Sequence, residues 1–278
     1  MYNLQNFNEY GVAYPFDFSD KSIKEEELLV EYEKFQKKAN IHFGKKITLK
    51  PNLLSLFFDK LCFNQDVISN VKKLIGPDLY IWSSAIFAKD GDSKKIVSYH
   101  QDNPYWQLTT SKVVTVWIAI TESKEISGAL KVFPGSSKLG LINKIDVPNA
   151  DEAYKKGMKT THENDMLSYR QNLDEFLKKN NPITVNLNKK QYSIHHVNCV
   201  HGSLPNKSDK PRIGYAIRYI SSDTKHINRS SDSAVHVCGT KNTYYIDEKR
   251  PNQDFSEDAI KNYEIAMKAA GSFGNKKY

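Results

Sequence analysis

Ser98-Tyr99-His100-Gln101-Asp102-Asn103-Pro104-Tyr105-Trp106 is the stretch on which the interpretation of this chain turns. It places His100 and Asp102 two residues apart at the end of a predicted β-strand. Side chains at i and i+2 of a strand point to the same face, about 7 Å apart at Cα, so both can reach one metal ion. With a second histidine they would form the two-histidine, one-carboxylate set of non-haem Fe(II) oxygenases. A surface histidine beside a surface aspartate is the alternative.

The candidates for the second histidine are His195, His196 and His201. His201 is favoured because Gly202 and Ser203 follow it, and a glycine there is typical of a strand end where the backbone passes close to another group. His201 is therefore expected to complete the metal site.

Arg212 follows His201 in the sequence and is a candidate for binding an anion beside the metal site. Residues 205–209 form a turn cluster, so Arg212 is expected to begin a strand antiparallel to that of His201, with about 4.8 Å between the two strands. Arginine binds carboxylates with two parallel hydrogen bonds. An iron site beside Arg212 suits a 2-oxo-dicarboxylate, which chelates the metal with its keto-acid end and pairs its far carboxylate with the guanidinium.

The composition favours a protein that acts on small molecules. The 278 residues are 39% hydrophobic and 12% aromatic, enough for a sizeable core. The formal net charge is +8, but lysines alternate with acids, as in residues 21–38, and no Arg-rich stripe or aromatic nucleic-acid motif is found. We expect a solvated lysine-rich surface, or steering of small anions into a cleft, and no nucleic-acid partner.

The cysteines and the hydropathy pattern bear on the compartment. Cys62, Cys199 and Cys238 are widely spaced and odd in number, which argues against a disulfide framework and favours a cytoplasmic location. No apolar run approaches the roughly 20 residues of a membrane span, and the first residues lack the features of a signal peptide. We expect no membrane partner, and the sequence carries no signal for an oligomeric state.

Hydrophobic periodicity predicts helices first and strands after them. Apolar residues at three- and four-residue steps predict helices between about 20 and 76. Asn64 is the expected N-cap of the last of them, which Gly76-Pro77 ends. Residues 1–20 show no period and are expected to form a partly ordered arm. Residues 113–120, β-branched and almost wholly apolar, predict a central strand. Further strands are predicted at 79–87, 96–101, 129–133, 183–187, 192–196 and 213–219, and a last helix at 256–270.

This order favours a mainly β fold, a barrel or sandwich backed by helices. We expect one domain over residues 1–278, with a helical part at about 20–76 and a β core at about 79–239. Residues 135–182 form a long connection without strong strand character. Such connections are often lids or binding loops, so this segment is expected beside the mouth of the site, with a plain surface excursion as the alternative.

From about Leu79 to Gly239 the sequence resembles the phytanoyl-CoA dioxygenase family of Fe(II)/2-oxoglutarate-dependent oxygenases. The resemblance lies in ordered blocks: His100-Gln101-Asp102 with Tyr105-Trp106, then Trp117-Ile118-Ala119, then Gly128 and Phe133-Pro134-Gly135-Ser136-Ser137-Lys138, and last His201-Gly202-Ser203, Pro205-Asn206, Ser208, Arg212 and Arg218-Tyr219. Many relatives have histidine at the position of Ser137. Several blocks in one order make the resemblance specific.

The resemblance implies a double-stranded β-helix, or jelly-roll, core with iron at its open end. By position it implies His100, Asp102 and His201 as iron ligands. Around 2-oxoglutarate it implies Arg212 at the distal carboxylate, with Ser203, Gln101 and Trp117 as further contacts. Related halogenases have a small residue in place of the metal carboxylate. Because Asp102 is present, hydroxylation with O2 and release of succinate and CO2 is the expected reaction, in which the cofactor supplies the chemistry.

Aromatic and basic residues near these motifs are candidates for substrate contacts. Tyr105 and Trp106 are expected to wall the pocket, with aromatic core packing as the alternative. Arg218 lies an even number of residues after Arg212, so both can face one side of a strand. There Arg218 would meet a second anionic group or an internal acid.

The adjacent pair His195 and His196 must split between the two faces of its strand, because side chains alternate. One of them would face the interior, and we assign the substrate contact to His196. Core packing or surface exposure is the alternative for both.

The pattern is similar to a bacterial branch of the family, the 2-aminoethylphosphonate dioxygenases. We therefore expect a small anionic metabolite as substrate, such as an organophosphonate. An amino acid derivative or a natural-product intermediate is the competing substrate. A jelly-roll binding module without catalysis is the alternative of another class, which the complete set of site residues disfavours. Nucleic-acid demethylation is disfavoured because the sequence has no basic stripe.

Overall fold

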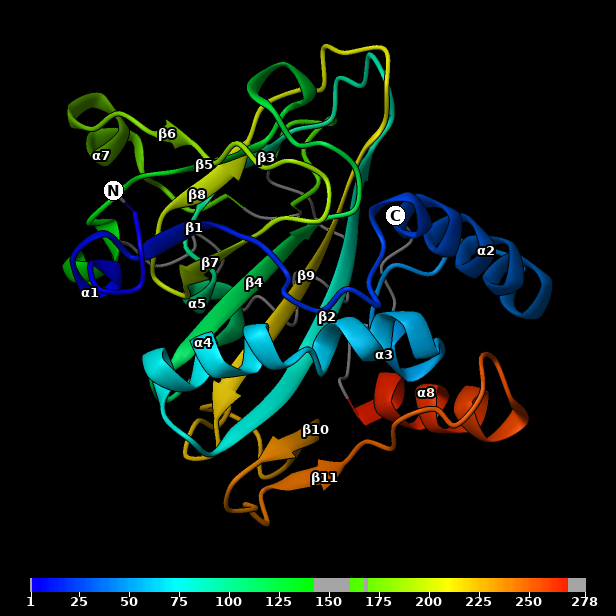
Figure 1. The fold of residues 1–278 in the computed structure, drawn as a ribbon. Helices are drawn as coiled ribbons and strands as arrows, with labels where there is room; N and C mark the ends of the chain where they lie inside the picture. Colours follow the sequence, from blue (N-terminus) through cyan, green and yellow to red (C-terminus); the bar gives the residue numbers. More distant parts are fainter. Residues whose placement is uncertain (1, 143–160, 168–169, 270–278) are drawn as a thin grey trace.

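Two β-sheets and a layer of helices make up the fold (Figure 1). The computed structural model describes residues 2–142, 161–167 and 170–269. The larger sheet has the strand order β1-β7-β4-β9-β2-β10-β11, and the smaller sheet has the order β3-β8-β5-β6. Neighbouring strands pair antiparallel, except β10 and β11, which are parallel. This architecture confirms the predicted mainly β, jelly-roll fold.

The strands and helices have the following bounds. The strands are β1 (Val12–Phe16), β2 (Leu79–Lys89), β3 (Val97–His100), β4 (Val113–Ala119), β5 (Leu130–Val132), β6 (Ile183–Thr184), β7 (Tyr192–His196), β8 (His201–Ser203), β9 (Arg212–Ser221), β10 (Asp232–Cys238) and β11 (Tyr245–Asp247). The helices are α1 (Phe7–Tyr10), α2 (Glu25–Phe43), η1 (Pro51–Leu53), α3 (Leu56–Cys62), α4 (Gln65–Ile75), α5 (Asn103–Trp106), η2 (Glu125–Ser127), η3 (Ser136–Leu139), α7 (Asp174–Lys179) and α8 (Glu257–Ala269).

Alternation along the central strand β4 divides the core in two. Val116 and Ile118 point outward and belong to the large cluster formed with the helices. Trp117 and Ala119 point the other way, into the cluster between the two sheets. Both faces of β4 are thus buried, which explains its nearly continuous apolar sequence.

The helices α2, α3, α4 and α8 lie over the outer face of the larger sheet (Figure 1). Helix α4 begins where predicted, because the Asn64 side-chain oxygen accepts hydrogen bonds from the backbone N–H groups of Asp66 and Val67, at 3.0 and 3.3 Å. It ends before Gly76, which has a positive φ of 97°. The N-terminal helices that were expected to back the sheet are therefore present. They cover its outer face, so its inner face is available to the site.

The prediction of a partly ordered arm at residues 1–20 is wrong. These residues contain α1 and β1, and β1 pairs with the edge of β7. Val12 and Ala13 are completely buried. The apolar run of β1 is too short to show the alternation that would predict a strand. It forms a strand because it pairs with the edge of β7.

The segment 135–182 is described only in part. Its described portion contains η3, residues 161–167 and α7, and Met166 and Leu167 line the central cavity. The rest of the expected lid, residues 143–160 and 168–169, lies outside the described residues.

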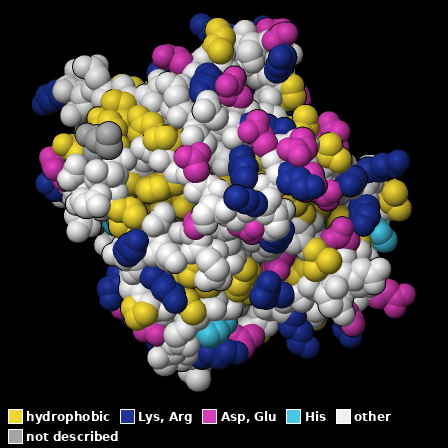
Figure 2. All heavy atoms as spheres, in the orientation of Figure 1, with side chains coloured by type: hydrophobic (Ala, Val, Ile, Leu, Met, Phe, Trp, Pro, Cys, Tyr) yellow, Lys and Arg dark blue, Asp and Glu magenta, His cyan; other side chains and the backbone are white. Residues whose placement is uncertain are grey.

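The surface agrees with the interspersed charge pattern of the sequence. On the face shown in Figure 2, lysine and arginine side chains alternate with aspartate and glutamate side chains and form no stripe of one sign. Among the described helices, none has the length and apolar character needed to cross a membrane.

Candidate active site

Strand pairing in the smaller sheet brings two histidines side by side. His100 ends β3 and lies directly opposite His201 at the start of β8, with their ring centroids 4.3 Å apart. The two strands approach closely at Gly202, where an added Cβ would lie 2.6 Å from the Val97 carbonyl oxygen. A side chain at position 202 would push the strands apart, so glycine there maintains the spacing of the imidazoles.

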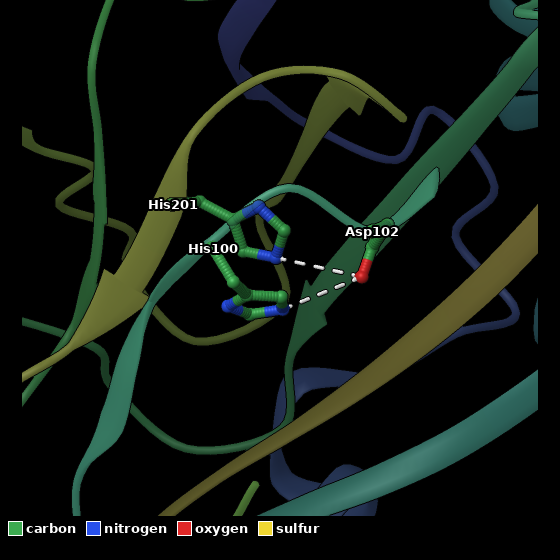
Figure 3. Close-up of side chains that lie close together, drawn as sticks. All are labelled: His100, Asp102 and His201. Carbon is green, nitrogen blue, oxygen red and sulfur yellow. Dashed lines mark ion pairs between the residues drawn. The ribbon is translucent and has the colours of Figure 1, made fainter. Parts of the chain in front are cut away.

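Asp102 reaches the same point from a turn. Strand β3 ends at His100, and Asp102 has helical backbone angles at the start of α5, where its N–H donates to the Val197 carbonyl. Its Oδ1 lies 3.5 Å from His100 Nε2 and 3.9 Å from His201 Nε2 (Figure 3). The prediction that His100 and Asp102 converge is confirmed, but the cause is the turn after the strand and not alternation along it.

The backbone fixes which nitrogen of each histidine faces the carboxylate. His100 Nδ1 lies 2.8 Å from the Ser98 carbonyl oxygen, and His201 Nδ1 lies 2.9 Å from the Cys199 carbonyl oxygen. A carbonyl only accepts, so in the neutral rings both Nδ1 atoms carry the proton. Both Nε2 lone pairs are then free to bind a metal ion, as is common for histidine ligands.

The three donor atoms lie within 4.8 Å of one another and are buried. Burial alone would raise the pKa of Asp102, but His201, His100 and Arg218 outweigh it, and the pKa is lowered. Burial, followed by the charge of His100, lowers the pKa of His201 to about 4. A divalent metal binds the ionised form of a carboxylate and the neutral form of an imidazole, so the residue types at this point fit a divalent iron ion.

A cavity of about 210 Å³ opens over these three residues. The sequence-predicted residues that line it are His100, Asp102, Tyr105, Trp106, Trp117, His201, Ser203, Arg212 and Arg218. Residues far apart in the sequence thus share one cavity, as the motifs predicted.

Arg212 reaches the cavity by a different route from the predicted hairpin. Strand β8 pairs with β3 and β5 in the smaller sheet, whereas β9 lies between β4 and β2 in the larger one. The turn cluster therefore carries the chain from one sheet to the other. Arg212 faces His201 across the sandwich and does not lie beside it on a neighbouring strand.

The Arg212 guanidinium is buried and only partly satisfied. Its Nη2 donates to the Gly128 carbonyl at 2.9 Å, and its Cζ lies 5.5 Å from the centroid of the Trp117 ring. Its Nε has no hydrogen-bond partner among the described residues. Trp117 packs tightly over Gly214, where an added Cβ would lie 1.8 Å from the indole. An anion is the natural partner for such a group.

Sequence reasoning missed Lys89, which ends β2 directly across from Arg212. Lys89 is completely buried, and its Nζ donates to Ser203 Oγ at 2.7 Å and to the Leu204 carbonyl. Burial, followed by the charge of Arg212, lowers its pKa to about 7. Lys89 lies two residues after Phe87, which lines the cavity. Since residues i and i+2 of a strand share a face, this spacing was the signal in the sequence that could have placed Lys89 on the inner face.

Two predicted site residues lie outside the cavity. His196 points away from it, where Nδ1 accepts from the Asn198 N–H and the ring packs near Phe7, so the assignment of a substrate contact to His196 is wrong. Gln101 is also turned away. Its amide donates to the carbonyls of Gly140 and Asn198, so it braces these segments and is not among the residues that line the cavity.

His195 takes the inward position instead. It lines the cavity, and its ring centroid lies 4.6 Å from that of His201. Burial, followed by the charge of His201, lowers the pKa of His195, which keeps the ring neutral. Neither ring nitrogen has a hydrogen-bond partner among the described residues.

Charged pairs close another part of the cavity. Lys50 Nζ pairs with Glu248 and also donates to the Trp82 carbonyl at 3.1 Å. Asp232 accepts from Trp82 Nε1 at 2.8 Å and lies 3.6 Å from Arg229. These charges are neutralised within the protein.

A jelly roll with two histidines and one carboxylate in its cavity defines the class of non-haem Fe(II)/2-oxoglutarate-dependent oxygenases, which use Fe(II), 2-oxoglutarate and O2. Residues 21–214 match the model of the family described as phytanoyl-CoA dioxygenase (PhyH). The chain belongs to this family.

Individual curated proteins match only part of this chain, at modest sequence identity. The chain is 30% identical over 89 residues to the ectoine dioxygenase of Streptomyces coelicolor, covering 31% of this chain and 30% of that protein. It is 26% identical over 170 residues to a probable alpha-ketoglutarate-dependent hypophosphite dioxygenase of Stutzerimonas stutzeri, covering 60% of this chain and 55% of that protein. The chain thus spans from about a third to about half of the length of these curated relatives.

The fold also matches solved structures. A nickel complex of the non-heme monooxygenase ThoJ aligns with a TM-score of 0.73 over 96% of both chains, at 24% identity. This likeness supports the fold.

Proposed function

We propose that the chain is an Fe(II)- and 2-oxoglutarate-dependent dioxygenase that hydroxylates an unactivated C–H bond of a small anionic metabolite. The observation that carries this proposal is the convergence of His100, Asp102 and His201 in one cavity with the buried guanidinium of Arg212. A non-catalytic binding module has no need of this combination.

Each residue has a distinct role in the proposed reaction. His100 Nε2, His201 Nε2 and the Asp102 carboxylate would hold Fe(II), which, when bound, supplies the oxidation chemistry with 2-oxoglutarate and O2. Arg212 would hold the distal carboxylate of 2-oxoglutarate across the sandwich. Trp117 forms the wall beside the guanidinium and excludes water, which strengthens the charge pair.

Lys89 and Ser203 complete the proposed carboxylate site. Because the Lys89 ammonium donates to Ser203 Oγ, the hydroxyl proton of Ser203 can point elsewhere, toward the carboxylate. Neither Lys89 nor Arg212 forms an ion pair with any residue that the structure describes. Two adjacent buried cations therefore favour an anionic ligand between the sheets.

The pH dependence of co-substrate binding tests the role of Lys89. Because its pKa is near 7, Lys89 loses its proton as the pH rises through neutrality. The charge of Asp165 raises this pKa, against the larger lowering effects of burial and Arg212. A carboxylate binds the protonated form better, so the Kd for 2-oxoglutarate should rise above pH 7 by up to about tenfold per pH unit, the limit for one linked proton. Calorimetry on nickel-loaded protein between pH 6 and about 9 measures this rise.

The control for this measurement is a matched pair of lysine variants. Lys89→Met should bind 2-oxoglutarate more weakly and with a flatter pH profile, while Lys112→Met, which removes an exposed lysine, should follow the wild type. An unchanged slope in Lys89→Met would assign the titration to another group.

The substrate is proposed to be an organophosphonate such as 2-aminoethylphosphonate. Support comes from Arg218, a further cation in the cavity besides Arg212, and from the relative named as a hypophosphite dioxygenase. The relatives named as ectoine dioxygenases favour the competing proposal, an amino acid derivative or a natural-product intermediate.

Succinate release separates these substrates. With Fe(II), ascorbate and 2-oxoglutarate, a phosphonate from a panel of phosphonates and amino acids should stimulate succinate formation well above the rate without substrate. Stimulation by amino acids alone would select the competing substrate class. A complete lack of succinate, with or without substrate, would favour the binding module.

The organisation and location of the chain complete the proposal. We propose one catalytic domain over residues 1–278, in which the segment 135–182 borders the cavity through Met166 and Leu167. A reducing, cytoplasmic location is supported by the three cysteines, which are free.

A further inference from the structure

One transverse row of the larger sheet carries polar side chains into the cavity. Thr115 on β4 lies directly opposite His195 on β7 and directly opposite Arg218 on β9. Arg218 in turn lies opposite Ser83 on β2. Side chains of directly opposite residues point to the same face of a sheet, and all four residues line the cavity.

Two members of this row form no side-chain hydrogen bond within the described part of the chain. Thr115 is 3% exposed and His195 is 2% exposed, yet Thr115 Oγ1 and both ring nitrogens of His195 form no hydrogen bond to any described residue. Buried polar atoms in folded proteins are almost always hydrogen-bonded. The cavity in front of them is therefore expected to hold a ligand with polar atoms.

The chemistry of the row selects an anion. The Arg218 guanidinium lies 5.2 Å from the centroid of the Trp106 ring and 5.9 Å from that of Phe87, within cation–π distance of both rings. A hydroxyl and an imidazole N–H lie beside it on strands about 4.8 Å apart. One cation and two neutral donors in a line match the oxygens of a carboxylate or a phosphonate.

The other cations near the cavity lie outside this row. Lys50 and Arg229 line the cavity but are not on strands β4, β7 and β9. Arg212 lies six residues before Arg218 on β9, about 20 Å away at Cα, beside Lys89 and Ser203. The row with Arg218 is next to the metal ligands, since the ring centroid of His195 lies 4.6 Å from that of His201 and all these residues line one cavity.

We infer that His195, Thr115 and Arg218 form a binding site for an oxyanion group of the substrate, a carboxylate or a phosphonate, beside the metal. This inference rests on the proposed function and extends it by assigning the residues that recognise the substrate. It also gives His195, which the metal site does not use, a role in binding.

Simple anions can test the site without turnover. Protein loaded with Co(II) and 2-oxoglutarate is titrated against methylphosphonate, acetate or uncharged propanol, and the paramagnetic relaxation of each probe by Co(II) is followed by NMR. We expect relaxation of methylphosphonate or acetate but not of propanol. The preferred anion identifies the substrate class, and 2-oxoglutarate affinity is measured separately by calorimetry.

Substitutions then show which side chains donate hydrogen bonds to the bound anion. Thr115→Val keeps the shape but removes the hydroxyl, and His195→Phe removes the ring nitrogens; each should weaken binding of the probe about tenfold, and Arg218→Met about 100-fold. His195→Gln, which keeps a donor, should recover part of the loss. The affinity for 2-oxoglutarate should stay within about twofold in all of these, as in the exposed control Lys34→Met.

The contrary outcomes are distinct. If Co(II) and 2-oxoglutarate bind but Co(II) enhances the NMR relaxation of neither anion, the inferred oxyanion site is wrong and the proposed function stands. If the variants weaken the binding of 2-oxoglutarate as much as the binding of the probe, the row belongs to the co-substrate site and the inference is overturned. If the wild type binds neither Co(II) nor 2-oxoglutarate, the proposed function itself fails.

Discussion

The Asp102→Ala variant is expected to lose metal-dependent turnover. The Asp102 carboxylate faces both histidine Nε2 atoms at 3.5 and 3.9 Å and supplies the one negative charge among the three donors. Residues that merely hydrogen-bond a metal ligand change metal affinity or activity by about 10- to 100-fold. Loss of a ligand should therefore cost at least about 100-fold. Fe(II) titration and succinate release measure the two consequences.

Asp223→Ala is the matched control, because Asp223 is exposed and, among the residues that the structure describes, pairs with Lys112 and accepts a hydrogen bond from Ser221 in its own turn. It should retain wild-type metal binding and turnover. Near-normal turnover in Asp102→Ala would mean that the carboxylate does not bind the metal, and the proposed site would have to be rebuilt around other donors.

The Arg212→Ala variant is expected to need far more 2-oxoglutarate. Removing one partner of a buried charge pair costs about 2–5 kcal/mol, which corresponds to a rise in KM of about 30-fold or more. Turnover at saturating 2-oxoglutarate should fall much less, because the metal ligands are unchanged. The dependence of succinate formation on 2-oxoglutarate concentration gives both values.

A shorter keto acid makes this test specific. 2-Oxobutyrate lacks the distal carboxylate, so wild type and Arg212→Ala should use it equally poorly. Arg250→Ala removes a half-exposed guanidinium that pairs with Asp59 and should leave the 2-oxoglutarate requirement unchanged. Equal KM values for 2-oxoglutarate in Arg212→Ala and wild type would assign the distal carboxylate to another group.

The sequence predicted most of the fold because its periodic signals are local. The apolar run of β4 and the helix cap at Asn64 follow from neighbouring residues alone, and both lie where predicted. The edge strand β1 and the parallel pair β10–β11 were not predicted, because they depend on partners elsewhere in the chain.

The site shows the same division. Motif spacing correctly predicted that His100, Asp102 and His201 converge. It did not predict that β8 and β9 lie in different sheets, because β8 has only three residues and its partner is set by the sandwich. The choice between His195 and His196 depends on the phase of β7, which its pairing with β4 determines. Lys89 was missed because a lysine at a strand end is usually exposed.

The division of labour between the sheets has a mechanical consequence. Two metal donors extend from strands of the smaller sheet and the third from the turn after β3, whereas the guanidinium of Arg212 extends from the larger sheet. A keto acid bound as proposed, at the metal and at Arg212, would tie the two halves of the sandwich together and fix their separation. Occupancy by the co-substrate would thereby set the width of the space in which the second reactant must fit.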